Sequence, residues 1–435
     1  WSEYRHQPRM TVNSRKLLYR ANLFIEIRCN LGHMEGVVSN TPWLSETDNS
    51  RFSEREAFKV SKWYSNAYRR VYISHHIDDG DPRYLADYNI DELERQILNS
   101  DTQVVMLPAR CHVGNCYYDT QIGHKHLGLG DLDPLKELSQ RLHKHGLVVT
   151  AYFSCIWDRR SYLEHPDWRQ MAASGEPAAK DKKHKSVCPN SPYREFARVL
   201  VEELVTNYDL DGLFFDMCMF DVLGFTPDEL VCYCDHCKKQ YYNLYGVPLP
   251  SEANWDDPNF IRFIQFRYDS VYRFVQYLIE SAKSINPNLA VYLQYLPMKG
   301  NWAMGQPQRV AELADFLLSD IYFRSGYLRM SIDTRLIRTI TNNKPFEVHL
   351  MGRPGHHEDA PNLKTMDQLR AEAFTIFANG GAVGLFDVIW PDGTLQESMW
   401  KRFGLMHDEI KQREAYAGGE PIGDIGILYS ERTRD

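Results

Sequence analysis

The chain lacks any apolar run long enough to cross a membrane. Leu147–Phe153 is among its longest apolar runs, whereas a membrane-spanning helix needs ~20 such residues. The chain also lacks an excess of positive charge, because its net charge is −8, so neither nucleic acid nor a membrane is an expected partner. No basic segment followed by an apolar one stands near the start, and we therefore expect a cytoplasmic protein.

Motifs of phosphate, Schiff-base and zinc-hydrolase chemistry are missing as well. The first apolar run, Val71–Ser74, is not followed by the glycine-rich turn that binds dinucleotides. Neither a phosphate loop nor a lysine set among apolar residues is present, so we expect no organic cofactor. A catalytic zinc site formed by His75, Asp78 and His112 remains an alternative, but the spacing typical of such sites is absent.

Aromatic side chains are what the sequence has in surplus. They make up 13% of the chain, with 26 Tyr, 20 Phe and 9 Trp, in a composition that is otherwise ordinary for a globular protein. Many of these rings must belong to the core. A surplus is also typical of carbohydrate sites, because sugar rings stack on aromatic faces.

Short apolar stretches alternate with segments of helical periodicity. The stretches that we interpret as strands are Val71–Ser74, Val104–Leu107, Leu147–Phe153, Gly212–Phe215, Leu289–Tyr292, Phe316–Ser319, Pro345–Leu350 and Ala382–Phe386. Helical periodicity predicts helices over Leu135–His145, Arg194–Tyr208, Phe260–Lys283, Met366–Asn379 and Met399–Arg413. Such alternation predicts a (β/α)8 barrel, with an open doubly wound sheet as the alternative.

The two ends of the chain differ from this pattern. We interpret residues 1–60 as an N-terminal extension and residues 61–417 as the barrel. Gly418–Pro421 has the composition of a linker. Ile425–Tyr429 then predicts a new strand, so residues 418–435 would be a linker and the first strand of a further domain.

Two acidic residues stand where a barrel enzyme keeps its catalytic groups, at the carboxyl ends of strands. Asp216 directly follows an apolar strand, and Glu347 lies in the seventh expected strand. A carboxylate in such a place is costly unless it is paired or used, so the alternative for each is a structural cap or ion pair. Two carboxylates across a barrel suit the cleavage of a glycosidic bond.

Further polar and aromatic residues are expected at the same end of the barrel. Imidazoles hydrogen-bond sugar hydroxyls, and aromatic rings stack on sugars, although a single histidine at a strand end is more often structural. The candidates for sugar binding are His75, His76, His112, Tyr117, Trp157, Asp158, Tyr295 and Trp390.

A cluster of cysteines indicates a metal site. Three of the nine cysteines are Cys232, Cys234 and Cys237. Their spacing is typical of a zinc site that is structural and closed, with ordinary loop thiols as the alternative. The fourth ligand would be Cys188, with Cys218 and His236 as the other candidates.

Two segments resemble α-L-fucosidases. Met106–Gly114 and the following Tyr117–Thr120 look like the Ala-Lys-His-His-Asp-Gly segment of that family, with Cys111 in place of its first His and Val113 in place of its Asp. Tyr208–Asp216 resembles the family's fourth-strand segment, which ends in Trp-Phe-Asp-Gly. The Asp of that segment is the nucleophile, and here the following Gly is replaced by Met217.

Two other segments, Cys188–Tyr193 and Cys232–Cys237, resemble the zinc-binding cysteines of β-galactosidases that carry a trimerisation domain. In those enzymes the fourth-strand acid is the general acid/base and a seventh-strand Glu is the nucleophile. Residues 60–415 together are similar to a barrel family described as hypothetical glycosyl hydrolases, which includes some α-L-fucosidases.

The resemblance implies a retaining exo-glycosidase, above all an α-L-fucosidase, acting on a glycoside or oligosaccharide. It implies Asp216 as nucleophile and leaves Glu347 as the expected acid/base. It also implies structural zinc and a homo-oligomer. A β-galactosidase-like hydrolase with the two roles reversed is the first alternative, and a non-catalytic carbohydrate-binding barrel is the second.

Overall fold

The computed structural model describes residues 62–178, 184–221, 230–297, 301–321, 326–354 and 362–423, with Gly426, Leu428 and Ser430. All of them belong to one structural unit, Asn49–Asp435. The predicted extension, residues 1–60, lies outside the described residues. Most of the predicted strand at 425–429 lies outside them too, so both remain predictions.

Eight parallel strands close into a barrel. They are β1 (Arg69–Ser74), β2 (Val104–Arg110), β5 (Val148–Ser154), β6 (Gly212–Asp216), β7 (Ala290–Gln294), β8 (Phe316–Asp320), β9 (Phe346–Met351) and β10 (Ala382–Val388). The strands pair in the order β1-β10-β9-β8-β7-β6-β5-β2, and β1 also pairs with β2. This last pairing closes the barrel, so the predicted (β/α)8 fold is confirmed and the open sheet is wrong.

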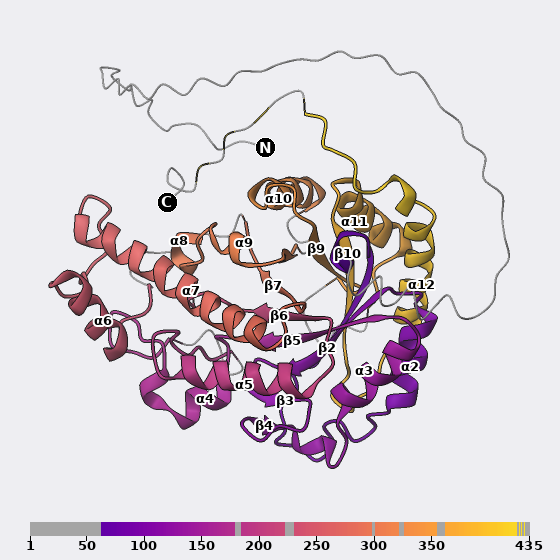
Figure 1. Ribbon diagram of the computed structural model, residues 1–435, viewed down its shortest axis with the longest axis horizontal. Helices are drawn as coiled ribbons and strands as arrows, with labels where there is room; N and C mark the ends of the chain where they lie inside the picture. The colour runs from indigo at the N-terminus through magenta and orange to yellow at the C-terminus, as the bar shows by residue number, and fades with distance from the viewer. Residues whose placement is uncertain are drawn as a thin grey trace, which may run out of the picture. The chain divides into compact units, whose positions relative to one another are not determined.

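Helices surround the strands (Figure 1). They are α2 (Ile90–Asn99), α3 (Pro134–Lys144), α4 (Arg159–Glu164), α5 (Tyr193–Asn207), α6 (Asp235–Tyr245), α7 (Pro258–Ile285), α8 (Asn301–Met304), α9 (Val310–Leu313), α10 (Gly326–Ile340), α11 (Met366–Ala378) and α12 (Glu397–Lys411). Local chemistry sets several of their starts. Asp133 caps α3 by accepting the Lys136 N–H, and Thr365 with Gln368 forms a capping box at α11.

Four 3₁₀ turns and two short strands complete the described part of the chain. The turns are Trp63–Ser65, Leu127–Leu129, Pro166–Trp168 and Glu414–Tyr416, and the strands are β3 (Asn115–Cys116) and β4 (His124–Lys125). Strand β3 pairs antiparallel with β2 just past its carboxyl end. Strands β3 and β4 therefore belong to the loop at the barrel mouth, whereas Trp63–Ser65 precedes β1 at the opposite end.

Alternation along the strands separates two cores. In β6, Phe214 packs with the interior of the barrel and Phe215 packs with the layer between strands and helices. At the amino end, Tyr64 stacks on Phe316 with 5.1 Å between ring centroids and covers the barrel floor. Because side chains alternate along a strand, Asp216 must point into the barrel at its opposite, carboxyl end.

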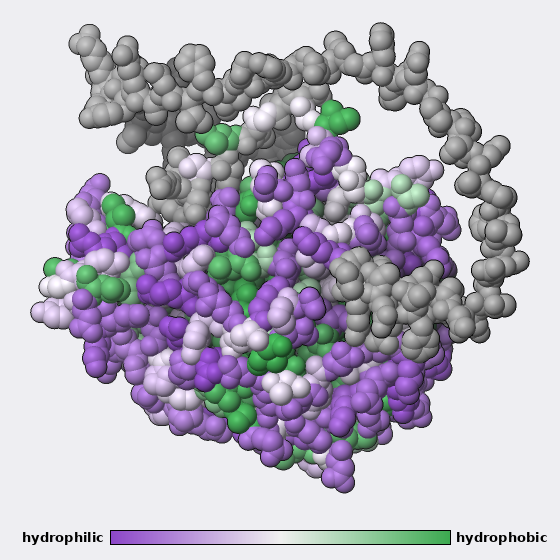
Figure 2. All heavy atoms as spheres, viewed as in Figure 1, coloured by the Kyte–Doolittle hydropathy of each residue, from purple (hydrophilic) through white to green (hydrophobic). Residues whose placement is uncertain are grey.

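The surface of this unit carries no strong signal about partners on the face that Figure 2 shows. Apolar residues there form small groups among hydrophilic ones. Of the helices that the structure describes, none combines the length and the apolarity that a bilayer span requires. The homo-oligomer expected from the sequence stays a prediction.

Candidate functional site

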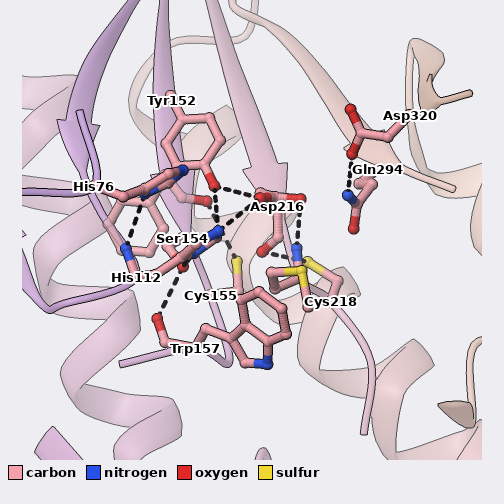
Figure 3. Close-up of polar contacts among 12 residues, drawn as sticks. His76, His112, Tyr152, Ser154, Cys155, Trp157, Asp216, Cys218, Gln294 and Asp320 are labelled. Carbon is pink, nitrogen blue, oxygen red and sulfur yellow. Dashed lines mark hydrogen bonds and ion pairs between the residues drawn. The ribbon is translucent and has the colours of Figure 1, made fainter. Parts of the chain in front are cut away.

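Asp216 lies at the centre of a polar cluster at the carboxyl end of β6 (Figure 3). Its Oδ1 accepts the backbone N–H of Met217 at 2.9 Å. Its Oδ2 accepts a hydrogen bond from the Tyr152 hydroxyl and lies 3.7 Å from Nε2 of His112. The side chain is buried, so both of its oxygens are held in fixed positions by the protein.

A group of rings lies beside this carboxyl. His76 and His112 stack with their centroids 3.8 Å apart, and Trp157 meets His112 edge-on at 4.8 Å. Nδ1 of His112 lies 2.7 Å from Oγ of Ser154, which donates its own hydrogen to the Trp157 carbonyl. The imidazole must therefore donate in this bond, and its orientation is fixed. Three of the predicted sugar-binding residues thus meet at Asp216, although their role stays a prediction.

A second carboxyl, Asp320, ends β8 and acts on Asp216 through its charge. Its oxygens accept a hydrogen bond from the Gln294 amide and lie 3.2 Å from Nδ1 of His349. Burial, followed by repulsion from Asp320, raises the pKa of Asp216 to about 7. Asp216 therefore keeps its proton up to about pH 7.

Glu347 does not lie at the strand end where the sequence places it, so that prediction is wrong. It is the second residue of β9, at the amino side of the barrel. Its Oε2 forms a buried ion pair with Nη1 of Arg70 at 2.8 Å. Burial opposes its charge, but Arg70 and His349 lower its pKa below the ordinary value. An ionised carboxylate in this position has no proton to donate at the barrel mouth.

His75 and Tyr117 also lie away from Asp216. Tyr117 is buried among the residues that pack outside the barrel, and the buried His75 contacts it with 5.1 Å between ring centroids. Nδ1 of His75 contacts the Ile73 carbonyl at 2.9 Å, and the Tyr117 hydroxyl donates to the His75 carbonyl. Alternation explains the error, because His75 and His76 are neighbours and only one can face the site.

Asp158 and Tyr295 are structural by their surroundings. Asp158 is fully buried, pairs with Arg110 at 2.5 Å and caps α4 by accepting the Ser161 N–H at 3.0 Å. Tyr295 is buried among the residues that pack between strands and helices. Both side chains are thus taken up by structural contacts away from Asp216, and their assignment to the sugar site stays a prediction.

Trp390 lies in the loop after β10 and packs beneath the Arg353 guanidinium, 4.7 Å from its ring. Arg353 pairs at 3.1 Å with Asp387, which also accepts the indole N–H of Trp400 in α12. Asp387 therefore points toward the helices, on the outer side of its strand. The structure thus joins Trp390 to a group of outward-facing residues and not to Asp216.

The sequence missed four residues of the polar cluster. They are Tyr152, Gln294, Asp320 and His349. Asp320 carried a signal that could have found it, because it ends an apolar strand just as Asp216 does. Gln294 carried the same signal at the end of β7. Tyr152 and His349 stand inside strands among apolar neighbours, where only the register reveals that they face the site.

The predicted metal ligands come together. The sulfur atoms of Cys188, Cys232, Cys234 and Cys237 lie within 4.8 Å of one another, and all four residues are buried. Sγ of Cys188 and Sγ of Cys237 are 3.4 Å apart, too far for a disulfide. The Asn190 amide and backbone N–H groups donate to three of these sulfurs. A tetrahedral zinc ion with four thiolate ligands fits this donor set.

The fold and these residues define a class: a (β/α)8 barrel with two carboxyls, the buried Asp216 and the partly buried Asp320, at the carboxyl ends of its strands. Residues 89–217 match the family model described as Hypothetical glycosyl hydrolase 6. The matched segment runs from the start of α2 to the residue after Asp216. No curated protein matches the sequence significantly.

Several solved structures share the fold. Alpha-L-fucosidase isoenzyme 2 from Paenibacillus thiaminolyticus has a TM-score of 0.66 at 20% identity, over 81% of this chain and 50% of that one. Beta-galactosidase from Bacillus circulans sp. alkalophilus has a TM-score of 0.60 at 15% identity, over 81% and 57%. The glycoside hydrolase domain of PgaB from Bordetella bronchiseptica has 0.59 at 14% identity, over 80% and 98%.

The chain therefore spans about half the length of the fucosidase and of the β-galactosidase. At these identities the likeness concerns the fold. The family match covers residues 89–217 of the barrel, which include Asp216.

Proposed function

We propose that this protein is a retaining exo-glycosidase that releases a terminal sugar, with α-L-fucosidase-like specificity. The observation that carries the proposal is Asp216, a buried carboxyl at the carboxyl end of β6, in contact with Tyr152 and beside His112. The family match extends through this residue. The fucosidase from Paenibacillus thiaminolyticus supplies a barrel of the same fold.

The nucleophile in this proposal is Asp216. One of its oxygens attacks the anomeric carbon, forming a glycosyl ester as the bond to the leaving oxygen breaks. The Met217 N–H and the Tyr152 hydroxyl hold the carboxylate in a fixed orientation for that attack. His76, His112 and Trp157 then line the sugar, the imidazoles as hydrogen-bond partners and the indole as a stacking surface.

Asp320 takes the place of Glu347 as the acid/base. The leaving oxygen needs a proton while the nucleophile needs a charge, and a carboxyl pair with one proton supplies both. In the free protein Asp216 holds the proton, with a pKa of about 7. In the complex Asp216 is the ionised nucleophile, so the proton has moved to Asp320, from which it passes to the leaving oxygen. Asp320 later takes a proton from the water that cleaves the ester, which restores the pair.

The first test is a panel of nitrophenyl glycosides of α-L-fucose, β-D-galactose, α-L-arabinose and α-D-galactose. We expect turnover of the α-L-fucoside and a loss of at least ~10³-fold in kcat for Asp216→Ala. Asp78→Asn is the matched control, because Asp78 pairs with Arg159 in the loop after β1. Near-normal turnover by Asp216→Ala would remove this residue from the chemistry.

Azide rescue separates the two assignments of roles. If Asp216 is the nucleophile, azide replaces it in Asp216→Gly and yields the inverted β-L-fucosyl azide. If Asp216 is the acid/base, as in the β-galactosidase-like alternative, azide attacks the glycosyl ester instead and yields the retained α-anomer. Proton NMR of the product distinguishes the two.

We further propose that the four-cysteine cluster holds a structural zinc ion. Cys188, Cys232, Cys234 and Cys237 would be its ligands. The ion would tie the start of α5 to the segment before α6 and stabilise the loops around β6. Because all four ligands are protein sulfurs, it would take no part in the hydrolysis.

A further inference from the structure

A row of charged groups, buried except for the partly buried Asp320, runs through the barrel from its amino end to the candidate site. Arg70 pairs with Glu347 at 2.8 Å. Nε2 of His349 lies 3.5 Å from Oε1 of Glu347, and its Nδ1 lies 3.2 Å from Oδ1 of Asp320. Asp320 in turn acts on Asp216. With His349 protonated, the row alternates in sign from Arg70 to Asp320.

Rings enclose the His349 imidazole on its other sides. Tyr72 stacks on it with 5.3 Å between centroids and 9° between planes, and Phe386 and Phe214 lie at 5.6 and 6.1 Å. The residue is buried. In surroundings of low polarity, a charge on the imidazole interacts strongly with the nearby carboxylates.

The charged and titratable groups near His349 come from five strands of the barrel. They are Arg70 and Tyr72 from β1, Tyr152 from β5, Asp216 from β6, Asp320 from β8 and Glu347 from β9. Strand β7 contributes the neutral Gln294, which bonds to Asp320. Burial alone would lower the pKa of His349, but Asp320 and Glu347 outweigh it and raise that pKa to about 9.

We propose that His349 is a positioning residue of the active site, an imidazolium held between Glu347 and Asp320 that fixes the Asp320 carboxyl and sets the pH range in which the carboxyl pair keeps its proton. The inference rests on the proposed function. Glu347 then acts indirectly: together with Arg70 it keeps His349 in place, and His349 holds Asp320. The cation favours the fully ionised pair, so it holds the loss of the last proton near neutral pH.

The test is the pH profile of kcat/KM for His349→Gln on the aryl glycoside that the wild type cleaves. Without the imidazolium, the carboxyl pair should lose its proton at a higher pH. The pH at which kcat/KM falls on the alkaline side, the alkaline limb of the profile, should therefore rise by ~1 unit. We also expect kcat to fall by more than ~10-fold with a smaller change in KM, because the variant keeps the sugar contacts. An active variant with an unchanged limb would overturn the proposal.

His407→Gln is the matched control. His407 is a buried histidine of α12 whose Nδ1 contacts the Ser100 carbonyl at 2.7 Å. It lies outside the barrel interior, so its replacement should leave the limb where it is. A shift as large as that of His349→Gln would overturn the assignment to His349.

A second measurement does not depend on catalysis. In the wild-type protein with ¹⁵N-labelled histidine, one imidazole should stay protonated up to about pH 9, and its signals should vanish in His349→Gln. Glu347→Gln removes one of the two carboxylates beside His349 and should lower the pKa of that imidazole. A His349 that is neutral at pH 7 would overturn the inference, even if no glycoside is cleaved. Inactivity on the whole panel with a protonated His349 would instead count against the proposed function alone.

Discussion

Asp216 is a carboxyl group whose surroundings work against its charge. Burial and the charge of Asp320 raise its pKa to about 7. A group whose pKa is raised by folding binds more protons in the folded state, so its contribution to stability falls between pH 3.8 and about 7. This costs stability at neutral pH, as expected of a site kept for chemistry and not for folding.

Asp216→Asn should therefore raise the free energy of unfolding while it abolishes turnover. The raised pKa of Asp216 corresponds to a loss of ~4 kcal/mol in the free energy of unfolding at pH 8. The amide of Asn avoids this loss but forms poorer hydrogen bonds. We therefore expect urea denaturation to show a net increase of ~1–2 kcal/mol in the free energy of unfolding. Asp158→Asn is the contrast, because it leaves Arg110 buried without its partner and should cost ~3 kcal/mol. A destabilised Asp216→Asn would favour the structural interpretation of Asp216.

The carboxyl pair also predicts the pH dependence of the wild type. Catalysis needs one proton on the pair, and Asp216 loses its proton with a pKa of about 7. We therefore expect kcat/KM to fall as the pH rises through about 7. If kcat/KM instead rose through that range, the acid would have to lie outside the pair, with Asp216 acting as an ionised nucleophile alone.

Met217 carries a backbone strain that follows from its place in the chain. Its φ is +56°, in the left-handed region where a side chain costs ~1 kcal/mol. The fucosidase segment that it resembles has Gly at this position, which removes that cost. The same conformation directs the Met217 N–H to Oδ1 of Asp216.

Met217→Gly should therefore stabilise the protein by ~0.5–1 kcal/mol and retain turnover, since the N–H to Asp216 is kept. Thermal unfolding together with kcat on the aryl glycoside measures both effects. A clear loss of stability would show that packing of the methionine side chain outweighs the strain.

At the scale of the element, the alternation of a strand decides which residues serve chemistry. Along β9, Glu347 and His349 both face the interior, but at different depths, so one lies at the floor and the other reaches Asp320. In the loop after β1, His76 faces the site and His75 faces outward. A shift of one residue in either element would exchange these roles.

The ion pair of β1 and β9 leads to a prediction about stability. Glu347→Ala leaves the buried Arg70 without its partner, and we expect a loss of ~3–5 kcal/mol in urea denaturation. Arg70→Met combined with Glu347→Met should recover most of it. The alternative that Glu347 is the acid/base predicts a loss of kcat in Glu347→Gln that azide or formate restores, with an unchanged thermal midpoint.

At the scale of the whole molecule, the cysteine cluster joins segments that are far apart in the sequence. Cys188 precedes α5, and the other three ligands stand beyond β6, next to and within α6. A metal ion held here would close a long loop, which favours the folded state. Three of the four ligands follow β6, the strand that carries Asp216, so such an ion would also stabilise the chain next to the site.

Zinc removal should therefore unfold this region before it affects chemistry directly. We expect one zinc per chain by elemental analysis, and a drop of more than ~5 °C in the thermal midpoint after chelation or in Cys234→Ser. Cys111→Ser, a buried cysteine outside the cluster, should keep its zinc. A chelated protein that loses activity at an unchanged midpoint would favour catalytic zinc.

Many features of this protein can be predicted from local patterns in its sequence. The alternation of apolar stretches with helical periodicity predicts the closed barrel, and the predicted helix at Arg194–Tyr208 differs from the observed Tyr193–Asn207 by one residue at each end. Asp216 is predicted as a site residue because a carboxylate directly after an apolar strand is costly. Cys232, Cys234 and Cys237 are predicted as metal ligands from their spacing. Each of these signals lies within a few neighbouring residues.

The tertiary structure alone decided which carboxyl accompanies Asp216. The sequence shows Glu347 and Asp320 as two acids on neighbouring strands. The closure and register of the barrel place Glu347 against Arg70 at the floor. They place Asp320 against His349 at the mouth, where it acts on Asp216. The physical reason is that the interaction between charges depends on their distance in space, and residues as far apart in the sequence as Arg70 and Glu347 meet only when the barrel closes.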